Sequence, residues 1–371
     1  MQRFFRIILG IVTLLASSIA FATPPEDQLE WESISEPPLE RHIALILPLE
    51  SSSFAQAAEN VKEGFSTAAM RETPLPLVIR IYSTTDDPLD IFSSYHEAIT
   101  AGAVFVVGPL TRDGVAALAS SKILEVPTLA LNTVDNSLIL PANLYLFGLQ
   151  MEAEANELAK LALSSNKTHV IIIGDDSSLS RRLQNAFTER WQSEAGRTAE
   201  SFRYDEDPAK LQQFRTLTTG TQHLIFLALD APKSRHLRAY LDPGVPVYAT
   251  SQVFSGNDNF LLNNDLNGIY FVDMPWLLQP DHPAVMAYRH ADKDNSTDMQ
   301  RLFALGIDAF RLMAHLLQLQ PLDQIAFDGV TGFIRYNYSN QFIREPVAAQ
   351  FQQGKAQLIK TPADFTPYEG Q

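Results

Sequence analysis

The chain has 371 residues, with 28 lysines and arginines, 43 aspartates and glutamates, and a formal net charge of −15. This acidic balance makes nucleic acid a poor partner, because phosphate contacts need clustered basic side chains. The absence of cysteine excludes disulfides, thiolate metal ligands and cysteine nucleophiles. The length exceeds what one hydrophobic core usually supports, so we expect two lobes.

The first residues have the pattern of an export signal. Arg3 and Arg6 precede a short apolar run, and an A-x-A cleavage site ends at Ala22. We therefore expect a cleavable signal peptide over residues 1–22, location in the periplasm, and no transmembrane helix in the mature chain. Thr23 stands where a bacterial lipoprotein needs its lipobox cysteine, so the sequence predicts no lipid anchor.

A proline-rich, acidic stretch over residues 23–41 is typical of a flexible tether. After it, apolar runs of strand length alternate with segments of helical periodicity. We expect buried strands at 43–47, 77–82, 103–107, 127–131, 169–173, 223–229, 245–250 and 269–274, and a β-type tail over 329–351. We expect helices after residue 53, at 88–100, 111–120, 151–163 and 179–191, after residue 208, and at 232–241 and 298–319. Ser53 followed by Gln56 indicates a capping box for the first of these helices.

Continuous apolar strands are typical of parallel sheets that are covered on both faces. Because two runs of alternating strand and helix follow one another, the pattern predicts an α/β fold with two lobes, each a mainly parallel sheet flanked by helices.

Five pieces of the chain together carry a resemblance to a known family. They are IALILPL (Ile43 to Leu49), VVGPL (Val106 to Leu110), YATSQV (Tyr248 to Val253), LNGIYFVDMPWLLQP (Leu266 to Pro280) and LFALGIDAFRL (Leu302 to Leu312). In this order the chain resembles the C-terminal domain of the LppC/LpoA family, the penicillin-binding protein activators, whose fold is similar to type 1 periplasmic solute-binding proteins. The resemblance spans about Ile43 to Gly354.

The resemblance implies how the chain divides. It places the first lobe at 42–148 with part of 275–325, the second lobe at 149–274 with part of 326–360, and a tail at 361–371. The chain would then cross the hinge more than once.

Polar side chains follow several predicted strands, where binding crevices lie in open α/β sheets. In solute-binding relatives, the loops after the first and third strands hold a carboxylate. The candidate residues for an inter-lobe ligand site are Ser52, Ser53, Gly108, Leu110, Thr111, Asn132, Thr133, Ser251 and Gln252. A helix cap and nothing more is the alternative interpretation of Gly108 to Thr111.

An apolar cluster at Pro275, Trp276 and Leu277 has two interpretations. It packs in the core or the hinge, or, where it is exposed, it anchors a protein partner, since tryptophan is enriched at interface hot spots.

No nucleophile elbow, zinc-binding pair of histidines or phosphate-binding glycine loop is present in the sequence. We therefore predict no catalytic residue, no metal and no cofactor. The resemblance implies a non-enzymatic periplasmic activator of a class A penicillin-binding protein, which promotes peptidoglycan synthesis by direct contact. The alternative is a periplasmic solute-binding protein for amino acids or similar small anions, which feeds an ABC transporter. A hydrolase with an unrecognised site is a third hypothesis.

Overall fold

The computed structural model describes residues 40–72, 75–121, 124–134, 139–220, 222–256, 260–288 and 296–359. These residues belong to one compact unit. The predicted signal peptide, nearly all of the predicted tether and the predicted tail lie outside the described residues. In the described part of the chain, no helix has both the length and the apolar character needed to cross a membrane.

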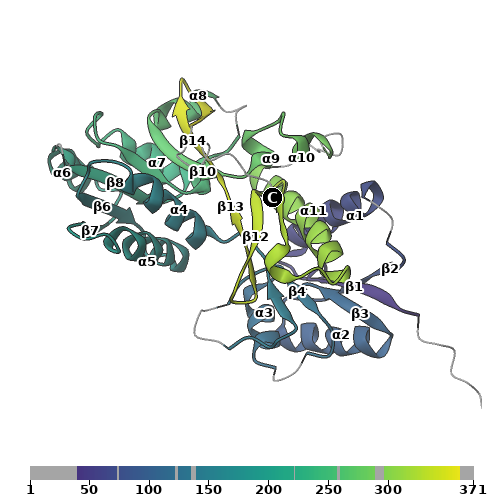
Figure 1. The fold of residues 1–371 in the computed structure, drawn as a ribbon. Coiled ribbons are helices and arrows are strands. Elements are labelled where there is room, and N and C mark those ends of the chain that lie inside the picture. Colours follow the sequence, from purple (N-terminus) through teal and green to yellow (C-terminus); the bar gives the residue numbers. More distant parts are fainter. Residues whose placement is uncertain are drawn as a thin grey trace, which may run out of the picture. The chain divides into compact units, whose positions relative to one another are not determined.

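Eight strands of the described chain form a first sheet in the order β11-β12-β13-β5-β4-β3-β1-β2 (Figure 1). Their bounds are β1 His42–Leu47, β2 Val78–Ser83, β3 Ala103–Val107, β4 Thr128–Ala130, β5 Leu144–Leu146, β11 Ala326–Asp328, β12 Phe333–Asn337 and β13 Gln341–Glu345. The strands from β2 to β5 pair in parallel, and β13 joins β5 in parallel at Gln341 and Leu146. The pairs β11–β12 and β12–β13 are antiparallel.

Seven described strands form a second sheet in the order β15-β14-β10-β9-β8-β6-β7. Their bounds are β6 His169–Gly174, β7 Thr198–Arg203, β8 His223–Ala228, β9 Val247–Ala249, β10 Ile269–Asp273, β14 Val347–Gln352 and β15 Lys355–Leu358. Strands β6 to β10 pair in parallel, whereas β14 is antiparallel to both β10 and β15. The predicted two-lobed α/β fold is confirmed.

Helices cover both faces of each sheet. Around the first sheet lie α1 Ala55–Arg71, α2 Pro88–Thr100, α3 Arg112–Ala119 and α11 Thr297–Leu317. Around the second lie α4 Met151–Leu163, α5 Ser178–Gln192, α6 Pro208–Thr218 and α7 Ala231–Arg238. The short helical elements are η1 Ser251–Val253, α8 Phe260–Asn263, η3 Asn264–Leu266, α9 Pro275–Leu278, α10 Pro283–Met286 and η5 Leu322–Gln324.

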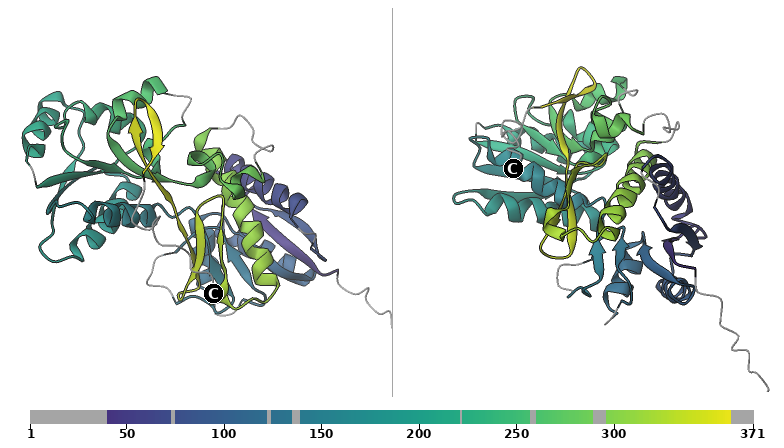
Figure 2. Two further views of the ribbon diagram at one scale, coloured as in Figure 1. Left: turned by 45° about the horizontal axis from the view of Figure 1, so that its top comes forward. Right: turned by 45° about the vertical axis from the view of Figure 1, so that its right-hand side comes forward.

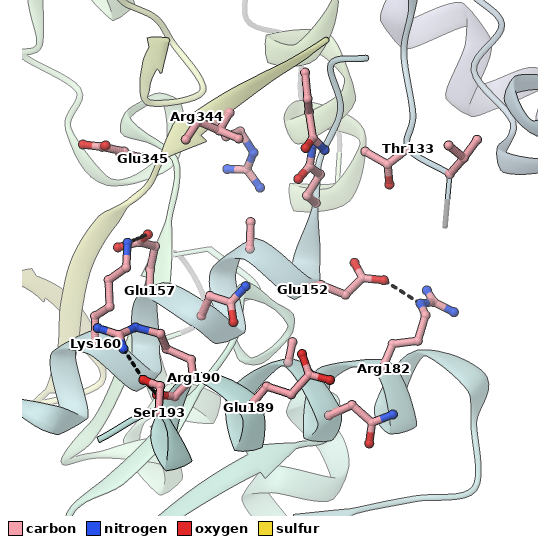
Figure 3. A pocket seen from close by; sticks show the side chains of 18 of the residues that line it. Thr133, Glu152, Glu157, Lys160, Arg182, Glu189, Arg190, Ser193, Arg344 and Glu345 are labelled. Carbon is pink, nitrogen blue, oxygen red and sulfur yellow. Dashed lines mark hydrogen bonds and ion pairs between the residues drawn. The ribbon is translucent and has the colours of Figure 1, made fainter. Parts of the chain in front are cut away.

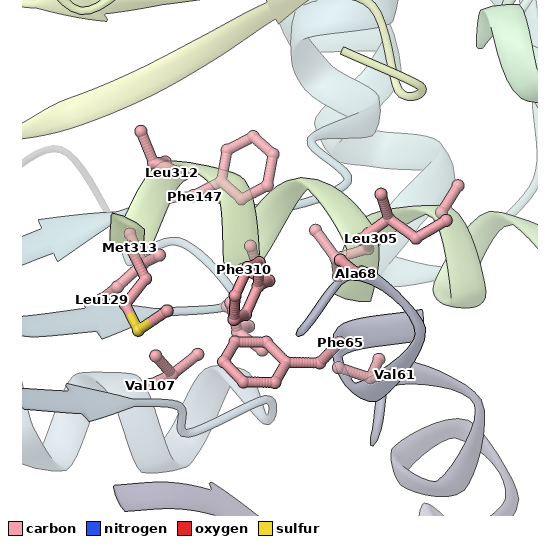
Figure 4. Close-up of a cluster of buried hydrophobic side chains, with 14 of the residues drawn as sticks. Val61, Phe65, Ala68, Val107, Leu129, Phe147, Leu305, Phe310, Leu312 and Met313 are labelled. Atoms are coloured by element: carbon pink, nitrogen blue, oxygen red, sulfur yellow. The ribbon is translucent and has the colours of Figure 1, made fainter. Parts of the chain in front are cut away.

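Alternate residues of β1 enter two separate hydrophobic cores. Ile43 and Leu45 face a cluster that includes α1 and α11, whereas Ala44 and Ile46 face a cluster that includes α2 and α3. In the cluster shown in Figure 4, the rings of Phe65 and Phe310 meet edge to face, with centroids 5.3 Å apart. Burial on both faces explains why the strand is apolar throughout.

Helices α1 and α11 lie side by side at a glycine contact (Figure 2). A Cβ atom at Gly64 would lie 1.9 Å from the carbonyl oxygen of Phe303, and one at Gly306 would lie 2.1 Å from that of Val61. The two backbones therefore approach too closely for any larger residue at either position.

Three details of the predicted elements were wrong or missing. β2 was expected to be buried, but Val78, Ile81 and Ser83 are exposed, because β2 is the edge strand of this sheet among the described residues. The capping box at Ser53 does not form; instead the Oγ of Ser51 accepts hydrogen bonds from the backbone nitrogens of Ser53 and Phe54, at 3.2 and 3.1 Å. The strands β5, β7, β11 and β15 were not predicted, and the last two lie on either side of the expected β-type tail over 329–351.

Within the described residues, the chain passes from one sheet to the other at three places. The crossings follow β5, β10 and β13, and the last consists of the single residue Pro346 between β13 and β14. The residue boundaries of the two lobes stay a prediction, since sheet membership leaves the crossing residues unassigned.

Candidate functional site

The first-lobe candidates surround the ends of β1, β3 and β4, but several of them have structural roles. The backbone nitrogen of Gly108 donates to the carbonyl oxygen of Leu129 at 2.8 Å. Its φ is +108°, and a Cβ atom there would lie 2.1 Å from the carbonyl oxygen of Ile46. Only glycine fits this left-handed conformation and close approach. The N–H of Gly108 is therefore used within the sheet and is not available to an anion.

Leu110 and Thr111 are also committed to the fold. Leu110 is buried in the core of the first lobe. Thr111 is the N-cap of α3, and its Oγ1 accepts a hydrogen bond from the backbone nitrogen of Gly114 at 3.3 Å. Leu110 thus packs in the core and Thr111 caps α3, in agreement with the helix-cap interpretation of this loop.

Asn132 closes the same loop. Its Nδ2 donates to the carbonyl oxygen of Leu110 at 2.9 Å, and its Oδ1 accepts from the backbone nitrogen of Thr133, also at 2.9 Å. Ser52 and Ser53 are exposed in the loop before α1. Thr133 is the first-lobe candidate that lines the cavity described next.

That cavity, the main cavity, has a volume of about 840 Å³ and is lined by residues of both lobes. Figure 3 shows Arg182 of α5 pointing to Glu152 of α4, with Nε 2.6 Å from Oε1. Glu152 also lies 3.5 Å from Arg112 of α3. Lys160 pairs with Glu157 at 2.5 Å. Because these charges of opposite sign are paired, the walls of the main cavity carry little net charge.

A smaller cavity of about 300 Å³ contains the second-lobe candidates Ser251 and Gln252. It is lined by Leu149, Met151, Glu154, Asp230, Ser251, Gln252, Asp298, Arg301, Leu302 and Arg344. Arg344 also lines the main cavity, so the two cavities meet at this side chain.

A buried ion pair joins the lobes at Arg344. Its Nη2 lies 2.7 Å from Oε1 of Glu154, and each side chain is 4% exposed. Arg344 lies on β13 of the first sheet, whereas Glu154 lies on α4 beside the second sheet. The other carboxylate oxygen of Glu154 accepts from the backbone nitrogen of Ser251 at 3.0 Å. The carboxylate therefore holds both an arginine of one lobe and a loop of the other.

A second buried pair lies beside the first. Arg301 of α11 makes two hydrogen bonds to the carboxylate of Asp273 at the end of β10, at 2.6 and 3.2 Å. Its Nη2 also donates to the carbonyl oxygens of Ser251 and Phe254, both at 3.0 Å. Burial opposes the charge of Arg301. The charge and hydrogen bonds of Asp273 outweigh this effect and raise the pKa of Arg301 above its usual value.

Sequence reasoning found Ser251 and Gln252 but missed Glu154, Arg301 and Arg344. A signal was present, because each of the three is a charged residue on an otherwise buried face. Arg301 lies one helical turn before the core residue Leu305, and Arg344 alternates with the buried Phe342.

The predicted partner contact lies mainly in the core. Trp276 is 6% exposed, and its ring centroid lies 5.5 Å from that of Phe303. Its backbone nitrogen donates to the carbonyl oxygen of Val330 at 2.9 Å. Pro275 is buried and Leu277 is half-buried. Core packing thus accounts for Trp276, whereas part of the Leu277 side chain stays accessible.

The sequence and the fold of this chain are similar to those of known proteins. A family model described as "LppC putative lipoprotein" matches residues 34–224 and 221–354. A curated relative from Photobacterium profundum, named penicillin-binding protein activator LpoA, is 25% identical over 333 residues, which cover 78% of this chain and 52% of the relative. The chain spans about half the length of the curated relatives it matches.

Two solved structures illustrate the likeness of fold. The C-domain of LpoA from Haemophilus influenzae, described as a regulator of PBP1A, is similar with a TM-score of 0.73 at 22% identity, over 86% of this chain and all of that one (100%). A chain from Chromobacterium violaceum, named "putative branched-chain amino acid ABC transporter", is 35% identical with a TM-score of 0.71, over 84% of this chain and 99% of that one.

Proposed function

Since the chain belongs to the LppC family, we propose that it is a non-enzymatic activator of a class A penicillin-binding protein. It promotes peptidoglycan synthesis by direct contact, and the synthase performs the chemistry. The similarity to relatives named penicillin-binding protein activator over more than 300 residues is the observation that carries the proposal. The export signal expected at residues 1–22 supports a location in the periplasm, where a synthase of this kind acts.

The test is a synthesis assay with purified components. The chain from Thr23 onward is added to a class A penicillin-binding protein of the same organism, and the polymerisation of a lipid-linked peptidoglycan precursor is measured over time. We expect the rate to rise until the two proteins are equimolar. The same preparation, heated until unfolded, is the control. An unchanged rate, together with no binding in a pull-down, would reject the activator function.

Leu277 provides a test of the contact surface. The buried part of Leu277 packs against the cores of both lobes. The rest of the side chain is accessible and is therefore available to a partner. We expect Leu277→Ser to weaken recovery of the synthase in a pull-down. The loss of packing should lower its melting temperature, so its circular dichroism spectrum at the assay temperature is compared with that of the parent to show that the variant is folded. Trp276→Ala is unsuitable for this purpose, because removing a buried tryptophan destabilises the fold by about 3–5 kcal/mol. Full recovery of the synthase with Leu277→Ser would place the contact elsewhere.

A second candidate function is solute binding. The main cavity of about 840 Å³ and the 35% identity to the Chromobacterium violaceum chain favour it. A ligand at one hundred times its dissociation constant should stabilise the protein by ~2.7 kcal/mol, which a melting experiment detects. We would test branched-chain and other amino acids one at a time. A shift with one amino acid that is lost in Arg344→Met would support a solute receptor, and no shift with any of them would count against it.

A further inference from the structure

The second lobe has a further cavity, which shares no lining residue with the main cavity or the smaller one, and its lining carries an excess of positive charge. This arginine cavity has a volume of about 480 Å³ and is formed by α6, α7 and η3. It is lined by Gln212, Arg215, Arg235, His236, Arg238, Ala239, Tyr240 and Asp265. Three arginines face one aspartate here, although the chain as a whole has a net charge of −15.

The three arginines have no acidic partner. In the part of the chain that the structure describes, neither Arg215, Arg235 nor Arg238 lies within 4.0 Å of a carboxylate oxygen. Many other arginines in the described part of the chain do pair with a carboxylate, as Arg203 does with Asp176. A local excess of basic side chains in a protein of negative net charge indicates a site for an anion.

Two of these guanidinium groups are partly buried and incompletely hydrogen-bonded. Arg235 donates from Nη2 to the Oγ of Ser255 at 3.2 Å, and Arg238 donates from Nη1 to the carbonyl oxygen of Asp242 at 3.5 Å. The Nε atoms of both arginines are buried without a hydrogen-bond partner among the described residues. Burial lowers the pKa of Arg238 from its usual value, and the nearby charge of Asp242 only partly offsets it. A buried cation without an anion is costly, so a bound anion would stabilise this arrangement.

The number and type of groups define the ligand. Guanidinium groups bind phosphate and carboxylate in a forked, two-bond geometry. Three arginines stand against Asp265 in the lining, and the charge of Asp242 near Arg238 reduces the excess to one positive charge. Phosphate is favoured over a single carboxylate because it offers more acceptor oxygens to several forked guanidinium groups. His236 lies at the same wall, with Nδ1 2.8 Å from the hydroxyl of Tyr204. The volume is larger than one phosphate ion needs, so it has room for the group that carries the phosphate.

We propose that the arginine cavity binds a phosphate-bearing ligand through Arg215, Arg235 and Arg238. The ligand is either a soluble phosphate compound or the phosphate headgroup of a lipid. The lipid source is included because Phe260, Leu261 and Leu262 are 50%, 74% and 53% exposed in α8, immediately before η3, which contributes Asp265. Exposed apolar residues beside basic ones are typical of surfaces that enter the lipid headgroup region.

Calorimetry with pyrophosphate tests the site directly. We expect saturable binding to the full chain, and a loss of affinity of about tenfold or more in the double variant Arg235→Gln/Arg238→Gln. Because neither Arg235 nor Arg238 lies within 4.0 Å of a carboxylate oxygen among the described residues, the double variant leaves no paired acid behind and should melt close to the temperature of the parent. The matched control is Arg203→Gln, which removes an exposed arginine of the same lobe. It should change the affinity less than about twofold.

Flotation with phosphatidylglycerol vesicles distinguishes the two sources. Binding to vesicles that is lost both in the double variant and in Leu261→Ser would assign the lipid headgroup. Binding of pyrophosphate without binding of vesicles would assign a soluble ligand. The absence of both kinds of binding in the parent would overturn the proposal. An equal loss in Arg203→Gln would also overturn it, because the attraction would then be general rather than local.

Discussion

Single residues at the cleft decide how the two lobes are joined. Arg344 and Glu154 form a buried pair, and Glu154 also holds the backbone of Ser251. The desolvation of two buried charges offsets much of their attraction, so the pair contributes little net stability compared with an apolar replacement. Loss of one partner is different, because it leaves the other charge buried and alone.

We therefore predict that Arg344→Met lowers the free energy of unfolding by about 3 kcal/mol, and that Arg344→Met with Glu154→Gln lowers it by clearly less. Urea unfolding of the parent, both single variants and the double variant measures the coupling. Losses that simply add in the double variant would contradict the prediction, since they would show that the two side chains act independently.

The carboxyl of Asp175, after β6, gives a prediction that depends on pH. Burial opposes its ionisation, but hydrogen bonds from Lys233 and Ser177 outweigh burial and lower the pKa of Asp175 from 3.8 to about 2. Its stabilisation is therefore complete above the unfolded pKa near 3.8 and is lost as the pH falls towards 2. At neutral pH, Asp175→Asn should cost about 1 kcal/mol once solvent screening is allowed for.

The measurement is urea unfolding of the parent and Asp175→Asn at several pH values. The difference between them should stay constant from neutral pH down to the unfolded pKa of 3.8, and then shrink as the pH falls from 3.8 towards 2. Asp176→Asn is the control, because Asp176 is 66% exposed and its pair with Arg203 should contribute little. A difference that stays constant below pH 3.8 as well would show that the Asp175 charge is not responsible.

At the residue scale, the sequence placed some of its candidates in the walls of the two cavities and missed the buried ion pair that joins the lobes. Ser251, Gln252 and Thr133 follow strands, and the rule that strand ends line crevices was enough to find them. Glu154 and Arg344 are 190 positions apart in the chain, and no local pattern announces that they meet. Gly108 shows the opposite error, since a glycine next to a predicted helix has the same local signature whether it binds an anion or allows two strands to approach.

At the scale of elements, the contact of α1 with α11 depends on two glycines. Alanine favours a helix over glycine by about 0.5–1 kcal/mol, so Gly306→Ala would stabilise α11 if the helix were isolated. In the protein the added Cβ atom meets the carbonyl oxygen of Val61 at 2.1 Å and the backbone nitrogen of Phe65 at 2.8 Å. Backbone atoms cannot rotate away from it.

We predict that Gly306→Ala lowers the free energy of unfolding by about 1–3 kcal/mol, which is the usual cost of overpacking a core. Gly244→Ala is the matched control, since Gly244 is exposed and its nearest neighbour is the carboxylate of Asp242 at 3.3 Å. Thermal unfolding of both variants makes the comparison. Equal stability of Gly306→Ala and the parent would mean that the two helices can separate without cost.

Elements with a periodic apolar pattern were predicted well, and those without one were missed. α2 and α4 agree with their expected bounds at both ends, because each has buried residues at helical spacing. β7 is exposed at all but two of its positions and carries polar residues, and β5 has only three residues, so neither has a strong apolar pattern. The burial of β2 could not be predicted, because whether a strand lies at an edge depends on strand order and not on its own sequence.

At the scale of the whole molecule, the inter-lobe pairs restrict how far the lobes can separate. The chain has no cysteine, so two introduced cysteines can be labelled without interference. Ser120 of the first lobe and Ala195 of the second are exposed and suit nitroxide labels. We predict that the distance distribution between these labels widens when Arg344→Met and Glu154→Gln are combined, because the remaining tie at Arg301 is then alone.

Pulsed electron spin resonance measures this distribution, with the labelled but otherwise unchanged chain as the reference. The far-ultraviolet circular dichroism spectrum of the combined variant should match the reference, which separates lobe motion from unfolding. If the two distributions coincide, the pair at Arg344 does not limit the motion of the lobes.

The interleaving of the two sheets also sets the time at which the protein can fold. The first sheet receives β11, β12 and β13 from residues 326–345, and the second receives β14 and β15 from residues 347–358. During synthesis the ribosome must therefore complete almost the whole chain before either sheet has all its strands. The early strands therefore lack their late partner strands for most of the time that the ribosome takes to make the chain.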